Sequence, residues 1–133
     1  MKRILSAVLM MTCSVSWAEW EYMGTTNDRE ANVYVDKSTI RRNAIIAKMW
    51  TLHYLSTIKV GHAGEKIKST KLLRAFNCRE ETEAAILIAE YSGSMGSGSV
   101  IASGSLEAEL WKWNPIVPHS IGETQWLIAC GKR

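Results

Sequence analysis

Alternating apolar residues constrain the fold of this chain more than any other feature of its sequence. The stretch AIIAKMWTLHYLS, residues 44–56, contains no Gly or Pro and places apolar residues at most positions of both alternating sets. Successive side chains of a β-strand point to opposite faces of a sheet, so this period of two predicts a long strand. Neither face of the strand is cleanly polar. We therefore expect both faces of the sheet to be partly covered.

Shorter stretches of the same kind predict the rest of an antiparallel sheet. They cover residues 19–25, 32–36, 70–78, 84–91 and 100–105. The polar stretch DKSTIRRN, residues 36–43, predicts a turn in which Asn43 takes a positive φ, and residues 57–69 predict a loop. The Gly- and Ser-rich residues 92–99 lie between two apolar stretches, which favours the tip of a wide hairpin over a linker.

The stretch HSIGETQWLIACG, which ends at Gly131, predicts a C-terminal helix. Ser120 is a suitable N-cap, Glu123 follows at the spacing of a capping box, and Gly131 is a suitable end. The predicted fold class is α+β, an antiparallel β-sheet of five or six strands packed with a C-terminal α-helix. We interpret the tryptophans of this region as cover for the apolar face of the sheet; they are Trp111, Trp113 and Trp126.

Residues 1–18 are expected to be a signal peptide rather than part of the fold. Lys2 and Arg3 precede an apolar run, and small residues lead to the expected cleavage site after Ala18. The apolar run is too short to cross a bilayer as a helix, which needs about 20 residues. We therefore predict an exported domain at residues 19–133, with no transmembrane segment after cleavage.

The chain has three cysteines, and two of them lie in the expected domain. Cys13 lies inside the predicted signal peptide, and the residues before it match a lipidation site poorly, so we expect it to be removed. Cys78 and Cys130 remain, and an even number of cysteines in an exported chain favours one disulfide. The alternatives are that the two thiols stay free or link two subunits.

Charge and motif spacing indicate a protein without catalytic chemistry. The formal net charge of +3 falls to +1 without Lys2 and Arg3, and the sequence has no basic stripe interleaved with aromatic residues, so we expect no nucleic-acid partner. His53, His62 and His119 lack the spacing of metal ligands, and neither a nucleophile elbow nor a phosphate-binding loop motif occurs. We predict no enzyme, no metal and no cofactor. The charged residues expected in solvated turns are Arg41, Arg42, Glu80, Glu81 and Glu83.

Three segments resemble a known family. NVYVDKSTIRR followed by KMWTLHYL, AFNC followed by EYSGSMGSG, and WNPIVPHSIGETQWLIAC together are similar to the surface-adhesin protein E-like domain of Gram-negative bacteria. The resemblance covers about residues 20–131. It implies an antiparallel sheet with a C-terminal helix and a disulfide between Cys78 and Cys130. It also implies an outer-membrane adhesin that binds host matrix and serum proteins and can dimerise.

The sequence departs from the family pattern at His53, where Asp is usual, at His119, where Gly is usual, and in the stretch GHAGEKIK. The residues of the family's binding segments have no match here, so no binding residue is predicted. Our hypothesis is an exported, non-enzymatic binding protein that engages a protein partner, such as a host matrix or serum protein, in the periplasm or at the cell surface, with a homodimer as a further expectation. The alternative is a soluble periplasmic structural or accessory protein with an unknown ligand.

Overall fold

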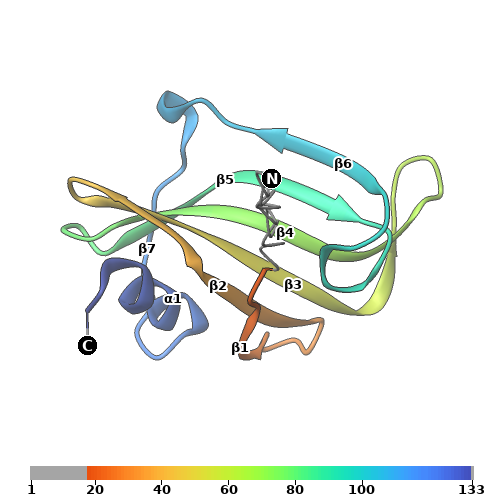
Figure 1. Ribbon diagram of the computed structural model, residues 1–133, viewed down its shortest axis with the longest axis horizontal. Coiled ribbons are helices and arrows are strands. Elements are labelled where there is room, and N and C mark those ends of the chain that lie inside the picture. The colour runs from red at the N-terminus through yellow and green to blue at the C-terminus, as the bar shows by residue number, and fades with distance from the viewer. Residues whose placement is uncertain (1–17, 133) are drawn as a thin grey trace, which may run out of the picture.

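Six antiparallel strands lie side by side in the order in which they follow one another along the chain (Figure 1). The computed structural model describes residues 18–132. A seventh strand of two residues, β7 (Asn114–Pro115), pairs with β5, and the helix α1 (Ile121–Cys130) follows it. The six strands are β1 (Glu21–Thr25), β2 (Ala31–Asn43), β3 (Ile46–Val60), β4 (Lys66–Asn77), β5 (Thr82–Tyr91) and β6 (Val100–Ser105). Two 3-10 turns, η1 (Ser94–Gly96) and η2 (Ala108–Leu110), flank β6.

The predicted α+β fold, an antiparallel sheet with a C-terminal helix, is confirmed, and β7 adds a short seventh strand. Within residues 18–132, no helix is both long and apolar enough to cross a membrane. The predicted signal peptide, apart from Ala18, and Cys13 lie outside the described residues. The cleavage after Ala18 therefore stays a prediction.

The turn predicted at residues 36–43 is wrong, because β2 continues through it. Residues 37–40 form a bulge between the paired residues Asp36–Trp50 and Arg41–Lys48. The Thr39 hydroxyl accepts a hydrogen bond from the Trp50 backbone N–H at 3.0 Å, so a side chain replaces a backbone acceptor of the ladder. The chain reverses only after Asn43, where Ala44 rather than Asn43 has a positive φ of 53°.

The long loop predicted at residues 57–69 is also wrong, since β3 and β4 extend into it and leave only residues 61–65 between them. Residues 57–60 and Lys66 lie at the exposed end of the hairpin, where a strand needs no apolar face, whereas Ile67 and Ser69 are buried. The hairpin tip predicted at residues 92–99 is confirmed. It folds back onto β4, where the Ser69 hydroxyl donates to the Gly93 carbonyl at 2.6 Å and accepts from the Gly96 N–H at 2.8 Å.

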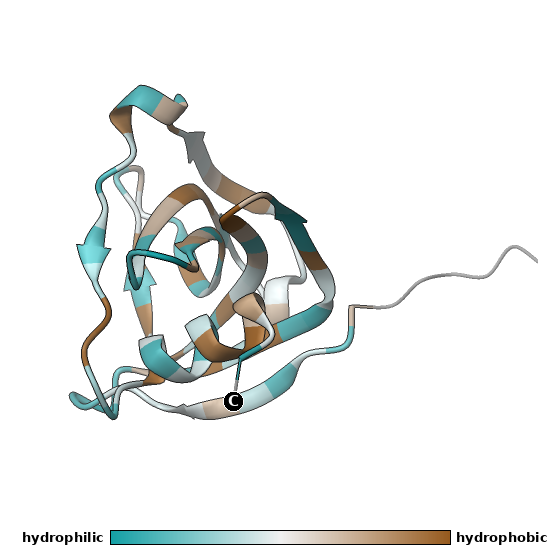
Figure 2. Ribbon diagram, turned by 90° about the vertical axis from the view of Figure 1, so that its left-hand side faces the viewer, coloured by the Kyte–Doolittle hydropathy of each residue, from teal (hydrophilic) through white to brown (hydrophobic). Residues whose placement is uncertain are grey.

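The sheet curls, so that strands far apart in its order reach the same helix (Figure 2). A Cβ atom placed on Gly24 of β1 would lie 3.4 Å from Ile121, and one placed on Gly122 would lie 3.6 Å from the carboxylate of Glu83 on β5. In a flat sheet, β1 and β5 would be about 19 Å apart. The face that carries α1 is therefore concave. We call it the concave face, and the opposite face the convex face.

The helix begins and ends where the sequence predicts. The Ser120 hydroxyl accepts a hydrogen bond from the Glu123 N–H at 3.1 Å, and Gly131 takes the left-handed conformation with a φ of 66°.

On the concave face, α1 completes a core formed by Val35, Ala47, Met49, Phe76, Trp126 and Ala129. On the convex face, Trp111 and Trp113 pack on a smaller core of Ala75, Ala84 and Ile86. Both faces are thus partly covered, as predicted.

Candidate binding surface

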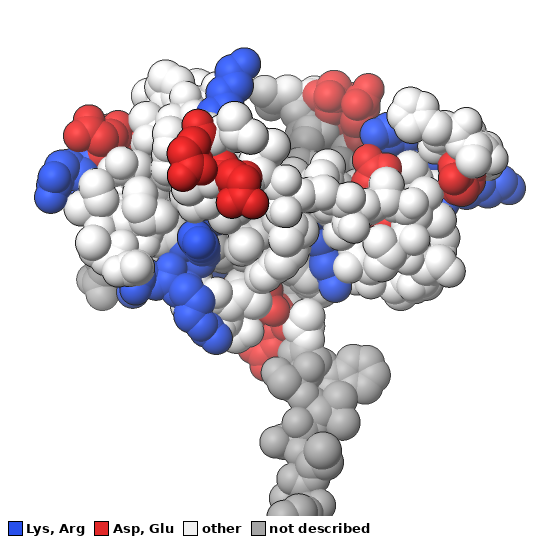
Figure 3. Space-filling model, turned by 90° about the horizontal axis from the view of Figure 1, so that it is seen from above, with Lys and Arg blue, Asp and Glu red and all other residues white. Residues whose placement is uncertain are grey.

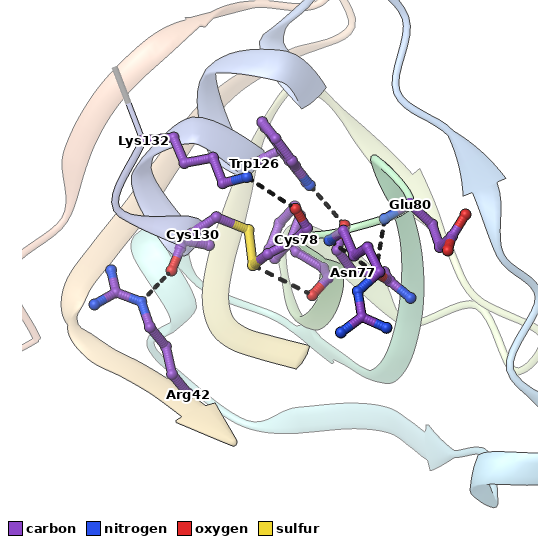
Figure 4. The surroundings of a disulfide bond; sticks show 10 residues. Arg42, Asn77, Cys78, Glu80, Trp126, Cys130 and Lys132 are labelled. Carbon is purple, nitrogen blue, oxygen red and sulfur yellow. Dashed lines mark hydrogen bonds between the residues drawn. A yellow bond between two sulfur atoms is a disulfide. The ribbon is translucent and has the colours of Figure 1, made fainter. Parts of the chain in front are cut away.

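A disulfide holds the end of α1 against the concave face (Figure 4). Cys78 follows β4 and Cys130 is the last residue of α1, and their sulfur atoms are 2.09 Å apart with a Cα–Cα distance of 5.6 Å. This pairing is the one predicted. The Trp126 indole N–H donates to the Asn77 carbonyl at 2.9 Å, and Arg42 Nε donates to the Ala129 carbonyl at 2.8 Å. The helix is therefore fixed over one end of the concave face.

The other end of the concave face carries an apolar hollow. Leu72 pairs with Ile88, and Ile88 with Gly104, so these three residues lie in one row across β4, β5 and β6. Leu72 alternates with Phe76 along β4, which places the row on the concave face. The hollow measures about 390 Å³, and we call it the β6 hollow. Its lining residues are Leu72, Ala85, Ile86, Leu87, Ile88, Gly104, Ser105 and Leu106.

The strand beside this hollow has a free edge. β6 pairs with β5, and within residues 18–132 no strand pairs with its other side. Its sequence, VIASGS, contains no charged residue and no Pro, and nearly all of it is exposed. Edge strands are usually protected by charges, Pro or a covering segment, because their unpaired backbone groups can pair with another chain. Apolar side chains remain exposed around it, at Ile88 (40%), Val100 (55%) and Leu106 (48%).

An incompletely paired ion pair lies next to the hollow on the concave face. Arg74 Nη1 is 3.4 Å from Glu83 Oε1, while Arg74 Nε and Glu83 Oε2 are buried without a hydrogen-bond partner among the described residues. Arg74 pairs across the sheet with Ala85, which lines the hollow. Glu83 was expected in a solvated turn, and that expectation is wrong because β5 already begins at Thr82. Unsatisfied buried groups of this kind are uncommon in folded proteins.

His53 lies on the same face of the sheet as Arg74, and its pKa is strongly lowered. Burial, and then the positive charge of Arg74, lower the pKa of His53 to about 4. The imidazole is therefore neutral in the folded protein near pH 7. His53 lies in the strand predicted at residues 44–56 and is partly buried.

The lowered pKa of His53 predicts that the free energy of unfolding decreases in mild acid. Because unfolded His53 takes up a proton near pH 6.5 and folded His53 only near pH 4, the folded state loses stability as pH falls through that window. We expect the free energy of unfolding to fall by roughly 2 to 3 kcal/mol more in the native protein than in His53→Gln between pH 7.5 and 4.5. Urea denaturation at each pH measures this difference. His62→Gln, in the exposed loop, is the matched control and should behave as the native protein; equal pH profiles for all three would contradict the prediction.

The remaining residues considered in the sequence are dispersed. His62 lies in the loop between β3 and β4, and His119 is exposed just before α1. Across residues 18–132, no group of three His, Cys, Asp or Glu side chains is placed to hold a metal ion. Sequence reasoning missed the β6 hollow, because Leu72, Ile88 and Leu106 have the pattern of ordinary core residues. The absence of charge in residues 100–105 was the one available signal.

Known proteins share this fold. A family model described as surface-adhesin protein E matches residues 20–131. The crystal structure of protein E from non-typeable Haemophilus influenzae is similar, with a TM-score of 0.63 and 14% identity, over 89% of this chain and 79% of that chain. Crystal form II of Haemophilus influenzae protein E gives a TM-score of 0.62 at 13% identity, over 83% of this chain and 87% of that chain. At these identities the likeness concerns the fold. No curated protein matches the chain.

Proposed function

Because this chain belongs to the surface-adhesin protein E family, we propose that it is an exported protein that binds a protein partner, such as a host matrix or serum protein, and catalyses no reaction. Membership of an adhesin family points to a surface protein and to binding rather than catalysis. The observation that supports partner binding is the uncharged free edge of β6 beside the apolar β6 hollow. This combination is typical of sites that accept another chain.

The expected mode of binding is addition of an extended segment to β6. Backbone groups of the partner would pair with the free side of β6, and one apolar side chain of the partner would enter the hollow between Ile88 and Leu106. The volume of the hollow, about 390 Å³, lies within the range of ~300–1,000 Å³ that is typical of ligand pockets. A second copy of the chain could use the same edge, and a homodimer is therefore part of the proposal.

The test is binding of the exported protein to immobilised vitronectin and laminin, at about 0.15 M and 1 M salt. Contacts made by apolar side chains and backbone hydrogen bonds are little screened by salt, so we expect saturable binding at both concentrations. A sample with the Cys78–Cys130 bond reduced is the control for folding and should bind less. Absence of binding by a well-folded sample would leave the family membership as a statement about fold and would overturn the proposal for these partners.

The alternative, a soluble periplasmic accessory protein, is supported by a predicted signal peptide whose Cys13 matches a lipidation site poorly. The two proposals differ in where the protein lies in the cell. Protease added to intact cells should degrade a surface protein and spare a periplasmic one, whereas cells with a permeabilised outer membrane should lose both. Protection in intact cells would favour the alternative.

A further inference from the structure

A groove crosses the convex face, opposite the β6 hollow. Lys48 and Trp50 alternate along β3 with the core residues Ala47 and Met49, so their side chains lie on the convex face. Three adjoining hollows lie there; the first measures about 310 Å³, and the other two, of about 530 and 220 Å³, are also lined by Ala18, the last residue of the predicted signal peptide. Arg41 lines the first and the second, and Trp50 lines the second and the third. We call this surface the aromatic–basic groove; its principal residues are Arg41, Lys48, Trp50, Lys71, Trp20 and Tyr91.

Two cations face each other at one end of the groove. Arg41 and Lys48 are direct cross-strand partners, an arrangement in which like charges destabilise a sheet. Neither of them takes part in any of the ion pairs formed within residues 18–132. The Lys48 ammonium lies 5.3 Å from the ring centre of Trp111, and Arg41 donates to the Ile40 carbonyl at 2.9 Å. Their charges are thus held in place and left without an anionic partner in this part of the chain, which favours an external anion.

A third cation is held between aromatic rings at the other end. The Lys71 ammonium lies 5.0 Å from the ring centre of Tyr91 and 5.8 Å from that of Trp20. A side chain at Gly96 would collide with Lys71, so the glycine lets η1 pack closely against it. A lysine held in this way loses little further conformational freedom when it binds a ligand. The two ends of the groove therefore repeat the same combination of a fixed cation and an aromatic ring.

Between the two ends lie acceptors for hydroxyl groups. Asp36 is only 2% exposed yet lines the second and third hollows, and its Oδ1 accepts from the Ser38 backbone N–H at 3.0 Å. Thr39 lines the same two hollows. A carboxylate in the middle of the groove repels any anion beside it, whereas it accepts hydrogen bonds from sugar hydroxyls, so the anionic groups of a ligand belong at the two ends of the groove. Trp50 offers an apolar ring surface beside it.

From this arrangement we propose that the aromatic–basic groove binds an acidic polysaccharide, a chain of sugar rings that carries carboxylate or sulfate groups. The apolar faces of sugar rings pack on Trp50 and Trp20, the hydroxyls reach Asp36, and the anionic groups meet the cations at the two ends. In Figure 3, several Lys and Arg side chains lie close together at the lower left, with acidic side chains above them, while other basic side chains are scattered over this face. This site lies on the face opposite the β6 hollow, so it goes beyond the proposed protein partner and can fail or succeed independently of it.

The test is calorimetric titration of the exported protein with two acidic octasaccharides, one from heparin and one from alginate. Heparin represents sulfated host chains and alginate represents bacterial chains that carry carboxylates only, so the tighter ligand identifies the source. Arg41→Gln with Lys48→Gln should weaken binding at least tenfold. The charge-matched pair Lys66→Gln with Lys68→Gln, at the start of β4, should change the affinity by less than twofold. Arg41→Gln alone, at an exposed position, gives the same comparison if the double variant melts early.

Binding of either octasaccharide that depends on Arg41 and Lys48 supports the proposal, as does a failure of neutral dextran to bind. Three results would overturn it. One is no binding of either acidic octasaccharide by the folded protein. Another is an equal loss of affinity in the control variant Lys66→Gln with Lys68→Gln, which would mean that net charge alone attracts the ligand. The third is tighter binding of an oligothymidylate of matched charge, which would assign the groove to single-stranded nucleic acid.

Discussion

Replacing both Cys78 and Cys130 by Ala is expected to lower the free energy of unfolding by about 4 kcal/mol. The bond joins residues separated by 52 positions, and closing a loop of that length removes conformational entropy from the unfolded chain. Its effect is also local, because Cys130 ends the helix that completes the core on the concave face. Urea denaturation of the native protein and the double variant measures the difference.

Reduction of the native protein provides the control for this result. A reduced sample should unfold at the same urea concentration as the double variant, because both lack the same link. Alkylation of the unreduced exported protein should label neither Cys78 nor Cys130. A loss below 1 kcal/mol, or two labelled thiols per chain before reduction, would contradict the role given to the bond.

Replacing Trp126 by Ala is expected to cost about 3 to 5 kcal/mol, the range typical of a large aromatic side chain removed from a core. Trp126 is 5% exposed, packs with Phe76 and Met49 in the main core, and donates its indole N–H to the Asn77 carbonyl. The substitution leaves a cavity and also leaves the Asn77 carbonyl without this donor.

Two comparisons separate the cavity from the hydrogen bond. Trp126→Phe keeps most of the buried surface and loses the indole N–H, so it should cost less than half as much as Trp126→Ala. Val117→Ala, at an exposed position before the helix, should change the free energy of unfolding by less than 0.5 kcal/mol. A cost below 1 kcal/mol for Trp126→Ala would place this side chain outside the core and would free it for contact with a partner.

The elements with regular local patterns could be predicted from the sequence. The period of two in residues 44–56 identified β3, and the Ser120, Glu123 and Gly131 signals identified both ends of α1. The limits of β2, β3 and β4 could not be predicted in the same way. A polar stretch such as residues 36–43 is compatible with a turn or with a bulged strand, and only pairing with β3, through the Thr39 hydroxyl, decides between them.

The two surfaces that carry the proposals depend on contacts between distant residues. The β6 hollow forms because the curl of the sheet brings β4, β5 and β6 into one concave surface, while α1 covers its other end. The aromatic–basic groove unites Arg41, Lys48 and Lys71 from three strands with Trp20, which precedes β1. No basic stripe is visible in the sequence, since these cations become neighbours only in the folded sheet.

The most direct measurement is the affinity of residues 19–133 for the proposed protein partner after Ile88→Glu, compared with Val117→Glu. Both substitutions add one charge at an exposed apolar position, at 40% and 64% exposure, but only Ile88 lines the β6 hollow. We predict that Ile88→Glu weakens binding to immobilised vitronectin or laminin at least tenfold, whereas Val117→Glu changes it by less than twofold. Equal affinities for the two variants would contradict a binding surface at β6.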